Sequence, residues 1–225
     1  MSSSELRFEL PGGGAALFTA RTEGNLSSVA GDGAVDAESA RKRLRRRIGV
    51  ERLVRGYQVH GAVVQRVERL PDPDAARREA DGQATALSSA GMMVLTADCL
   101  PVVLGSASAV AIVHAGWRGL AAGVLQSGVH ALRKLSGEEE ILAVIGPGAG
   151  PCCYEVGPEV QAIFGAAHAD ARRLDLRAIA RERLLAAGVT RVREVGACTI
   201  CDERFFSYRR EGDRAGRQAG VAWRS

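Results

Sequence analysis

The stretch MMVLTADCLPVVLGSASAVAIVHAGWRGL, residues 92–120, decides the fold predicted for this chain. It contains three short apolar runs, at 92–96, 102–104 and 110–113, which are separated by polar and small residues and a proline. Continuous apolar runs of this length, bounded by turn residues, are typical of strands that are buried on both faces. The stretch therefore predicts three buried strands.

A long helix is predicted to follow the third run. After the turn at 116–119, apolar residues recur at helical spacing from Leu120 to Leu135, which indicates one helix of about five turns. Toward the C-terminus the same reasoning predicts a strand at 141–145, helices at 159–164 and 175–187, and strands at 192–195 and 218–223.

The residues before this stretch predict a helix that ends at Gly49, an extended run at 52–59 that delivers His60, and a surface loop or short helix at 70–81. Because strands and helices alternate without a strict βαβ rhythm, we expect a mixed α/β fold, with a mixed sheet flanked by helices. The length predicts a single domain, 1–225, in which 1–14 form a loosely ordered or edge segment.

Composition is that of a compact globular protein, with 46% apolar and 25% charged residues. No secretion signal is evident, and no window approaches 18 uninterrupted apolar residues, so we expect a cytoplasmic protein with no membrane partner. Five cysteines in a reducing compartment serve metals or catalysis more often than crosslinks, and no structural disulfide is expected.

The net charge of +4 comes in large part from the basic run at 41–47. Ala40, Leu44 and Ile48 recur every four residues, which predicts a helix with one apolar side and arginines on its solvated side. A nucleic-acid surface is the competing hypothesis, but no recognition helix, zinc finger or aromatic RNA-binding signature accompanies the run. We expect no nucleic-acid partner.

Candidate metal ligands come from three separate segments. His60 and His114 follow apolar runs and precede glycine-containing turns, and Cys99 has a similar setting. Two imidazoles and one thiolate suit zinc and leave a fourth position for water or substrate. The competing interpretation is a buried thiol with two unrelated histidines, because these residues do not form the closely spaced pairs, C-x-x-C or H-x-x-x-H, by which metal sites are usually recognised. His130 and His168 are interpreted as ordinary surface or packing residues.

Arg118 is a candidate phosphate ligand, because it lies in the first turn of the predicted long helix, where free N–H groups and the helix dipole favour an anion. An arginine bound to a surface carboxylate is an equally good interpretation. The glycine-rich loop at 146–150 matches neither the Walker nor the Rossmann pattern.

The remaining cysteines form the motifs Cys152-Cys153 and Cys198-x-x-Cys201. No second C-x-x-C and no nearby histidine pair completes a structural zinc site, and a thioredoxin-like motif would stand at a helix start after the first strand. The sequence predicts reduced, partly buried thiols at these four positions.

Five ordered motifs carry a resemblance to a known family, and they span nearly the whole chain from about residue 24. They are QVHG at 58–61, TADCLP at 96–101, HAGWRG at 114–119, GPGAGPCCYEVG at 146–157 and FFSYRR at 205–210. In these motifs the chain resembles the YfiH-like laccase-domain proteins, long labelled multicopper polyphenol oxidases and now understood as purine nucleoside phosphorylases that also deaminate adenosine.

The resemblance implies zinc-dependent phosphorolysis of adenosine, inosine and S-methyl-5'-thioadenosine, in a layered α/β/β/α fold with mixed sheets. It implies that His60, Cys99 and His114 are the metal ligands and catalytic residues, and it adds Asn25 and Asp98 to Arg118 as substrate-binding candidates. After Asn25 the chain departs from the family pattern, with Val29 in place of a histidine and Gly33 in place of an acid. This departure leaves the preferred nucleoside open.

Three alternatives remain at this stage. Copper could occupy the same ligands adventitiously and oxidise phenols slowly, although four histidines cannot supply a multicopper cluster. Cys99 could be a nucleophile, activated by His60 or His114, in an amidase or deamidase. A non-catalytic protein with a structural metal is the third, and an open coordination position argues against it. The oligomeric state is not predicted.

Overall fold

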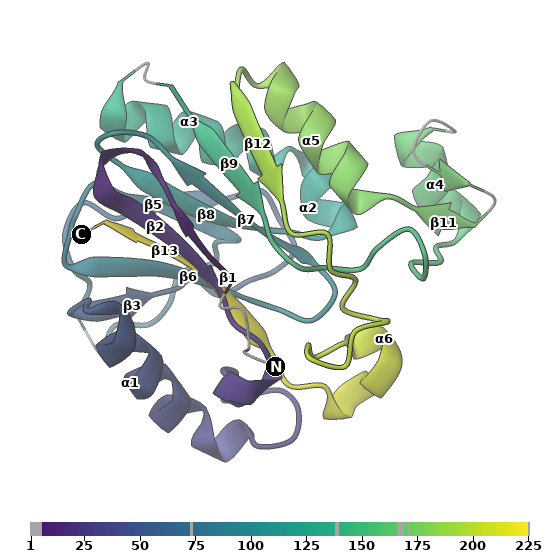
Figure 1. Cartoon of the computed structure of the whole chain (residues 1–225), viewed down its shortest axis with the longest axis horizontal. Coiled ribbons are helices and arrows are strands. Elements are labelled where there is room, and N and C mark those ends of the chain that lie inside the picture. Colours follow the sequence, from purple (N-terminus) through teal and green to yellow (C-terminus); the bar gives the residue numbers. More distant parts are fainter. Residues whose placement is uncertain (1–5, 73, 138–139, 166–168, 171, 225) are drawn as a thin grey trace.

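The computed structural model describes residues 6–72, 74–137, 140–165, 169–170 and 172–224, so His168 lies outside the described residues. Two mixed β-sheets lie face to face in the middle of the molecule, with helices on both outer sides (Figure 1).

The first sheet has five strands in the order β1-β2-β13-β6-β3. Neighbouring strands are antiparallel except β3 and β6, which are parallel. The N-terminal strand β1 therefore forms one edge, and the C-terminal strand β13 lies between β2 and β6. The strands are β1 (Leu6–Glu9), β2 (Gly14–Phe18), β3 (Arg52–Val54), β6 (Ala90–Thr96) and β13 (Gln218–Arg224).

The second sheet has six strands in the order β12-β9-β7-β8-β5-β4. The pairs β12/β9 and β5/β4 are parallel and the other pairs are antiparallel. Its strands are β4 (Val64–Arg66), β5 (Gly82–Thr85), β7 (Leu100–Gly105), β8 (Val110–Ala115), β9 (Leu142–Ile145) and β12 (Arg191–Glu194), and a separate small pair is formed by β10 (Ala169–Asp170) and β11 (Arg173–Leu174).

Helices cover the outer faces of the two sheets. The helices of the described residues are α1 (Ala37–Ile48), α2 (Trp117–Ala122), α3 (Val124–Ser136), α4 (Pro158–Phe164), α5 (Leu176–Ala186) and α6 (Tyr208–Glu211), with 3-10 turns at Pro11–Gly13, Arg21–Glu23, Ala34–Asp36 and Gly212–Arg214. The α1 helix packs on the five-stranded sheet, and α3 and α5 pack on the six-stranded sheet (Figure 1). The mixed-sheet α/β/β/α architecture is thereby confirmed.

Alternation along the strands explains why the apolar runs are continuous. In β6, Met92 and Val94 pack between the sheets, whereas Met93 and Leu95 pack toward α1. In β8, Ile112 faces the other sheet and Val113 faces α3 and α5. Successive side chains of a strand point to opposite faces, so a strand covered on both sides must be apolar at every position.

The structure confirms the predicted basic helix, which is α1. Ala40 and Leu44 are buried, and the N–H of Gly49, in a left-handed conformation with φ 74°, closes the helix onto the carbonyls of Arg45 and Arg46. Lys42, Arg43, Arg46 and Arg47 are exposed, as the stripe requires.

Two predicted elements were wrong in extent. The single long helix is two helices, α2 and α3, because Gly123 adopts φ 88° between them; the apolar spacing continues across the break and so conceals it. The extended run at 52–59 is a strand only as far as Val54, and an irregular segment leads on to His60. Among the described residues, no helix is both long enough and apolar enough to cross a membrane.

Candidate metal centre

The three predicted ligands come together where the chain passes from one sheet to the other. Cys99 lies in the turn between β6 of the first sheet and β7 of the second. The pairing of β7 with β8 sets His114 opposite Pro101, two residues after Cys99. His60 arrives from the loop between β3 and β4, and the ligand atoms of the three residues lie within 4.8 Å of one another. The two imidazole rings meet edge to face, with centroids 4.8 Å apart.

The donor set resembles a catalytic zinc site more than a structural one. Within the described part of the chain, no fourth His, Cys, Asp or Glu joins the three ligands. His60 is exposed whereas His114 is buried, so one side of the group faces solvent. Three protein ligands with one solvent-facing side are typical of zinc sites that keep a position for water or substrate.

Asp81 holds the loop that delivers His60. Its carboxylate accepts backbone N–H groups from Val59 at 3.1 Å, His60 at 2.9 Å and Gly61 at 2.7 Å. His60 has φ 62°, a conformation that costs energy for a residue with a Cβ and persists only when its surroundings hold it. The Asp81 carboxylate supplies that restraint. The prediction was that the extended run at 52–59 would place His60 at its end, and the structure does not bear this out.

The same carboxylate orients His114. Asp81 Oδ1 lies 2.8 Å from His114 Nδ1, and both side chains are buried. With Nδ1 bonded to a carboxylate, Nε2 is the nitrogen left for a metal, which is the usual arrangement of a metal-binding histidine with its carboxylate partner. The residues present therefore fit a metal ion.

Sequence reasoning missed Asp81, which it assigned to a surface loop at 70–81. Most of that loop is exposed, but Asp81 itself is fully buried. The available signal was weak: a single acid next to Gly82 at the start of an apolar strand, 33 residues away from its histidine partner.

Electrostatics among these side chains favour a charged Cys99 thiolate and a charged His114 imidazole. Burial raises the pKa of Cys99, but the nearby His114 charge and hydrogen bonds from His114 and His60 outweigh it and bring the pKa to about 6. Burial lowers the pKa of His114, while the Cys99 thiolate and Asp81 raise it to about 9. The site thus already holds sulfur in the form that binds metals.

Gly116 makes room for the ligands. A Cβ at this position would lie 2.7 Å from Cys99 Sγ and 3.3 Å from His60 Cδ2. The glycine turn after His114 is therefore required by close packing against two ligand side chains.

We expect Gly116→Ala to weaken metal binding by about 10- to 100-fold, the range typical of changes just outside a ligand shell, because its methyl group displaces Cys99 and His60. Competition with a zinc chelator measures this affinity. Gly196→Ala is the matched control, since its Cβ would meet no atom within 4 Å, and it should bind metal as the unaltered protein does. Equal affinities for the two variants would contradict the packing argument.

Asp98, a predicted substrate residue, is buried beside Cys99 with its carboxylate already engaged. Thr199 Oγ1 donates to Oδ1 at 2.7 Å and the Arg209 N–H donates to Oδ2 at 2.8 Å, while the Ala149 N–H donates to its backbone carbonyl. Asp98 has φ 88°, so these bonds also hold an unusual backbone turn in front of Cys99.

Asn25, the other predicted substrate residue, is also buried and engaged. Its Nδ2 donates to the carbonyls of Ala30 and Asp32, and its Oδ1 accepts the Arg217 N–H at 2.9 Å. It joins the loop that carries the exposed Val29 to the start of β13.

Further polar residues surround Cys99 without having been assigned a role from sequence. Burial and the negative charge of Cys99 raise the pKa of Tyr154 to about 12. The Arg209 guanidinium lies 5.0 Å from the Tyr154 ring centroid. Burial lowers the pKa of Arg217, and the charges of Cys99 and Asp98 oppose that change, which places Arg217 near both. Tyr154 and Arg209 belong to motifs quoted above, whereas no sequence signal singled out Arg217.

Arg118 lies in the first turn of α2, two residues after Gly116. It is exposed, and its guanidinium carbon is 4.4 Å from the Trp117 ring centroid. No carboxylate in the described part of the chain forms an ion pair with it, so the competing interpretation of a surface salt bridge lacks a partner.

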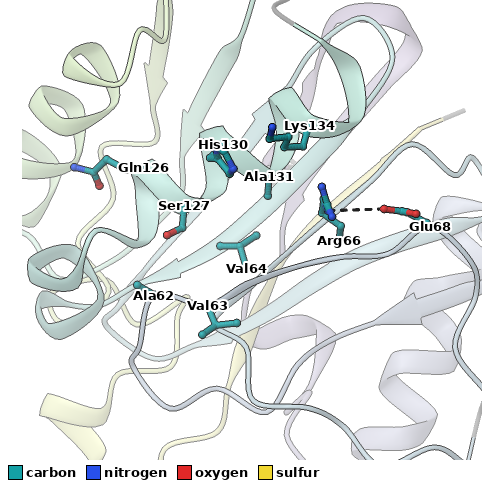
Figure 2. A pocket seen from close by; sticks show the side chains of 10 residues that line it. All are labelled: Ala62, Val63, Val64, Arg66, Glu68, Gln126, Ser127, His130, Ala131 and Lys134. Atoms are coloured by element: carbon teal, nitrogen blue, oxygen red, sulfur yellow. Dashed lines mark ion pairs between the residues drawn. The ribbon is translucent and has the colours of Figure 1, made fainter.

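A groove of about 800 Å³ lies elsewhere, between α3 and the segment of β4. Figure 2 shows Val64, Arg66, His130 and Lys134 among its lining residues. None of the three metal-ligand candidates lines it. His130, interpreted as a surface or packing residue, is exposed at this groove.

Comparison with known proteins identifies the family. The family described as multi-copper polyphenol oxidoreductase laccase matches residues 13–225. A Xylella fastidiosa protein named purine nucleoside phosphorylase is 44% identical, covering 99% of this chain and 92% of that protein. Purine nucleoside phosphorylase YfiH of Escherichia coli is 37% identical, covering 88% of this chain and 85% of that protein.

Solved structures agree in fold. The Neisseria meningitidis protein NMB0706 superposes with a TM-score of 0.85 and 31% identity, covering 97% of both chains. YlmD from Geobacillus stearothermophilus superposes with a TM-score of 0.86 and 28% identity, covering 100% of this chain and 98% of that one. The motifs, the layered fold and these matches lead to one conclusion: the chain belongs to the YfiH-like laccase-domain family.

Proposed function

We propose that this protein is a cytoplasmic, zinc-dependent purine nucleoside phosphorylase. Its substrates are adenosine, inosine and S-methyl-5'-thioadenosine, which it cleaves with inorganic phosphate to the free base and the sugar 1-phosphate, and it deaminates adenosine as a side activity. The observation that carries the proposal is the open three-ligand group of His60, Cys99 and His114 on its Asp81 support. The names of the relatives, purine nucleoside phosphorylases, supply the reaction class.

Zinc, when held by the three ligands, supplies a Lewis acid with one position open to substrate. The protein residues do the rest. Asp81 keeps His114 in the tautomer that presents Nε2 and fixes the His60 turn. Arg118 holds phosphate in an orientation suited to attack on the anomeric carbon, so that the bond to the purine nitrogen breaks as the bond to phosphate oxygen forms.

Asn25 and Asp98 serve the substrate pocket through the loops they hold. Both side chains are buried, and their polar atoms already bond to this chain. Asp98 anchors the backbone of Arg209, and Asn25 anchors the backbone of Arg217. We therefore propose that Asn25 and Asp98 act indirectly, by positioning Arg217 and Arg209 near Cys99.

A nucleoside panel tests the proposal. Zinc-loaded protein is incubated with adenosine, inosine and S-methyl-5'-thioadenosine, with and without phosphate, and bases and sugar phosphates are separated by chromatography. We expect base release that requires phosphate, and inosine from adenosine in its absence. Base release that does not depend on phosphate, or no reaction with any of the three nucleosides, contradicts the assignment.

One observation favours a second candidate, an amidase or deamidase with Cys99 as nucleophile. The pKa of Cys99 is lowered to about 6 beside a charged His114, as in cysteine–histidine enzymes. Alkylation by iodoacetamide separates the two: zinc should protect Cys99 if it is a ligand, and should not if it is a free nucleophile.

The laccase label of the family is not a good guide to the chemistry. A multicopper oxidase needs many more histidines than the four in this chain. Copper bound at the same three ligands would give at most a slow, adventitious phenol oxidation.

A further inference from the structure

Four cysteines outside the proposed active site converge on one point. Cys152 and Cys153 lie in the loop after β9, and Cys198 and Cys201 lie in the loop after β12. The four sulfur atoms lie within 4.8 Å of one another. Cys201 Sγ is 3.4 Å from Cys152 Sγ and 2.7 Å from Cys153 Sγ.

Sheet topology explains the convergence. Strands β9 and β12 are parallel neighbours, so both loops leave the same edge of the sheet. The loops stay together beyond the strands, since Gly148 and Cys198 form a parallel bridge and the Thr199 N–H donates to the Gly148 carbonyl at 3.1 Å. Cys152 and Cys153 are thus the second pair that the Cys198-x-x-Cys201 motif lacked in the sequence. Cys152 and Cys201 are exposed, whereas partly buried thiols were expected at these positions.

The separations suit one tetrahedral ion. Zinc–sulfur bonds of about 2.3 Å in a tetrahedron set the sulfurs about 3.8 Å apart. The two separations at Cys201, 2.7 and 3.4 Å, are shorter than this spacing, and no pair of sulfurs is more than 4.8 Å apart, so all four lie close enough to share one ion. A disulfide would use two of the sulfurs and leave the other two without a reason to point at the same place.

Hydrogen-bond donors and a positive charge lie close to the four-cysteine cluster. The Gly150 N–H donates to Cys198 Sγ at 3.2 Å, a hydrogen bond that is stronger when the sulfur is a thiolate. Two guanidinium groups bind the backbone of the same loop: Arg177 donates to the Ala197 carbonyl at 2.8 Å, and Arg210 donates to the Thr199 carbonyl at 2.8 Å. Arg210 is also paired with Glu211, whereas the Arg177 charge offsets part of the negative charge that four thiolates bring to a divalent ion.

We propose that Cys152, Cys153, Cys198 and Cys201 bind a second metal ion, a structural zinc that fastens the two loops to each other. Four thiolates with no open position are typical of structural zinc. The two loops also hold the turn in front of Cys99, since Ala149 and Thr199 both donate hydrogen bonds to Asp98. The ion therefore stabilises the wall of the proposed active site without taking part in the reaction, and its existence does not depend on the proposed function.

Metal analysis tests the proposal directly. Protein purified anaerobically in the presence of zinc should contain two zinc ions per chain. Cys201→Ser should contain one fewer, and because Cys201 is exposed, the substitution removes a ligand without disturbing the core. Cys99→Ser is the matched comparison, since it alters the other site. Zinc content that Cys201→Ser leaves unchanged overturns the proposal, whatever Cys99→Ser does.

Cobalt(II) substitution identifies the ligands. A tetrahedral cobalt site with four thiolates has an intense sulfur-to-cobalt charge-transfer band that grows with the number of thiolates. We expect this band in the unaltered protein and in Cys99→Ser, and a weakened or absent band in Cys201→Ser. A spectrum with a single thiolate ligand in the unaltered protein contradicts the site.

The unaltered protein offers a check that does not rely on any variant. Zinc should shield all four cysteines from iodoacetamide, and a chelator should expose them, as peptide mass spectrometry can show. Equal alkylation with and without zinc, or a Cys153–Cys201 disulfide in anaerobically prepared protein, overturns the proposal.

Stability gives an independent measure. The zinc-loaded protein should melt roughly 5 °C or more above Cys201→Ser, because an ion that binds only the folded state stabilises it. After chelation the two should melt together. A difference that persists without metal would show that Cys201 acts through packing, and would overturn the proposal.

Discussion

Cys99→Ser is expected to bind one zinc ion fewer per chain than the unaltered protein. Its phosphorolysis rate should therefore be lower by about 100-fold or more. A serine hydroxyl stays protonated at neutral pH, whereas the Cys99 sulfur is held as a thiolate by His114 and His60. Removing one of three ligands should weaken binding at least as much as a change behind the ligands, which typically costs about 10- to 100-fold in affinity. Zinc is measured on desalted protein and activity with inosine and phosphate.

Cys198→Ser is the matched control for this experiment. It should also lose an equivalent of zinc, but from the four-cysteine cluster, and it should keep the zinc bound by His60, Cys99 and His114. Zinc content in Cys99→Ser equal to that of the unaltered protein would remove Cys99 from the ligand set. Loss of activity with full zinc content would instead point to the nucleophilic role.

Arg118→Ala is expected to raise the phosphate KM or to lower phosphorolysis by about 10- to 1000-fold. Charged hydrogen bonds to an anion contribute on the order of 1.5 to 3 kcal/mol, and loss of orientation adds to the effect. The exposed guanidinium at the start of α2, with no ion-pair partner in the described part of the chain, is available for phosphate. Initial rates over a range of phosphate concentrations measure both parameters.

Adenosine deamination provides the internal comparison. Water is the nucleophile in that reaction and no phosphate is held, so Arg118→Ala should change it much less than phosphorolysis. Arg46→Ala, an exposed arginine on α1, is the matched control and should leave both activities unchanged. Equal loss of the two activities in Arg118→Ala, or an unchanged phosphate dependence, would make Arg118 a structural residue stacked on Trp117.

Local patterns predicted most of the central elements correctly. The runs that became β6, β7, β8 and β9 are apolar at successive positions because both faces of each strand are covered. The edge strand β12 was also predicted, at 192–195, but the edge strand β4 was not, because its three partly buried or exposed residues are too few to show a period. The break at Gly123 was hidden because the residues on both sides of it face the same core.

The sequence by itself determined most strands of the core, although not the buried strands β2 and β5, together with the basic helix and, through its motifs, the family and the three ligand candidates. Those features depend on local periodicity or on short runs of residues. The tertiary structure alone decided that Asp81 pairs with His114, 33 residues away, and that Cys153 meets Cys201, 48 residues away. Such contacts follow from which strands pair and in which register, and that choice depends on the packing of the whole core, which no local pattern records.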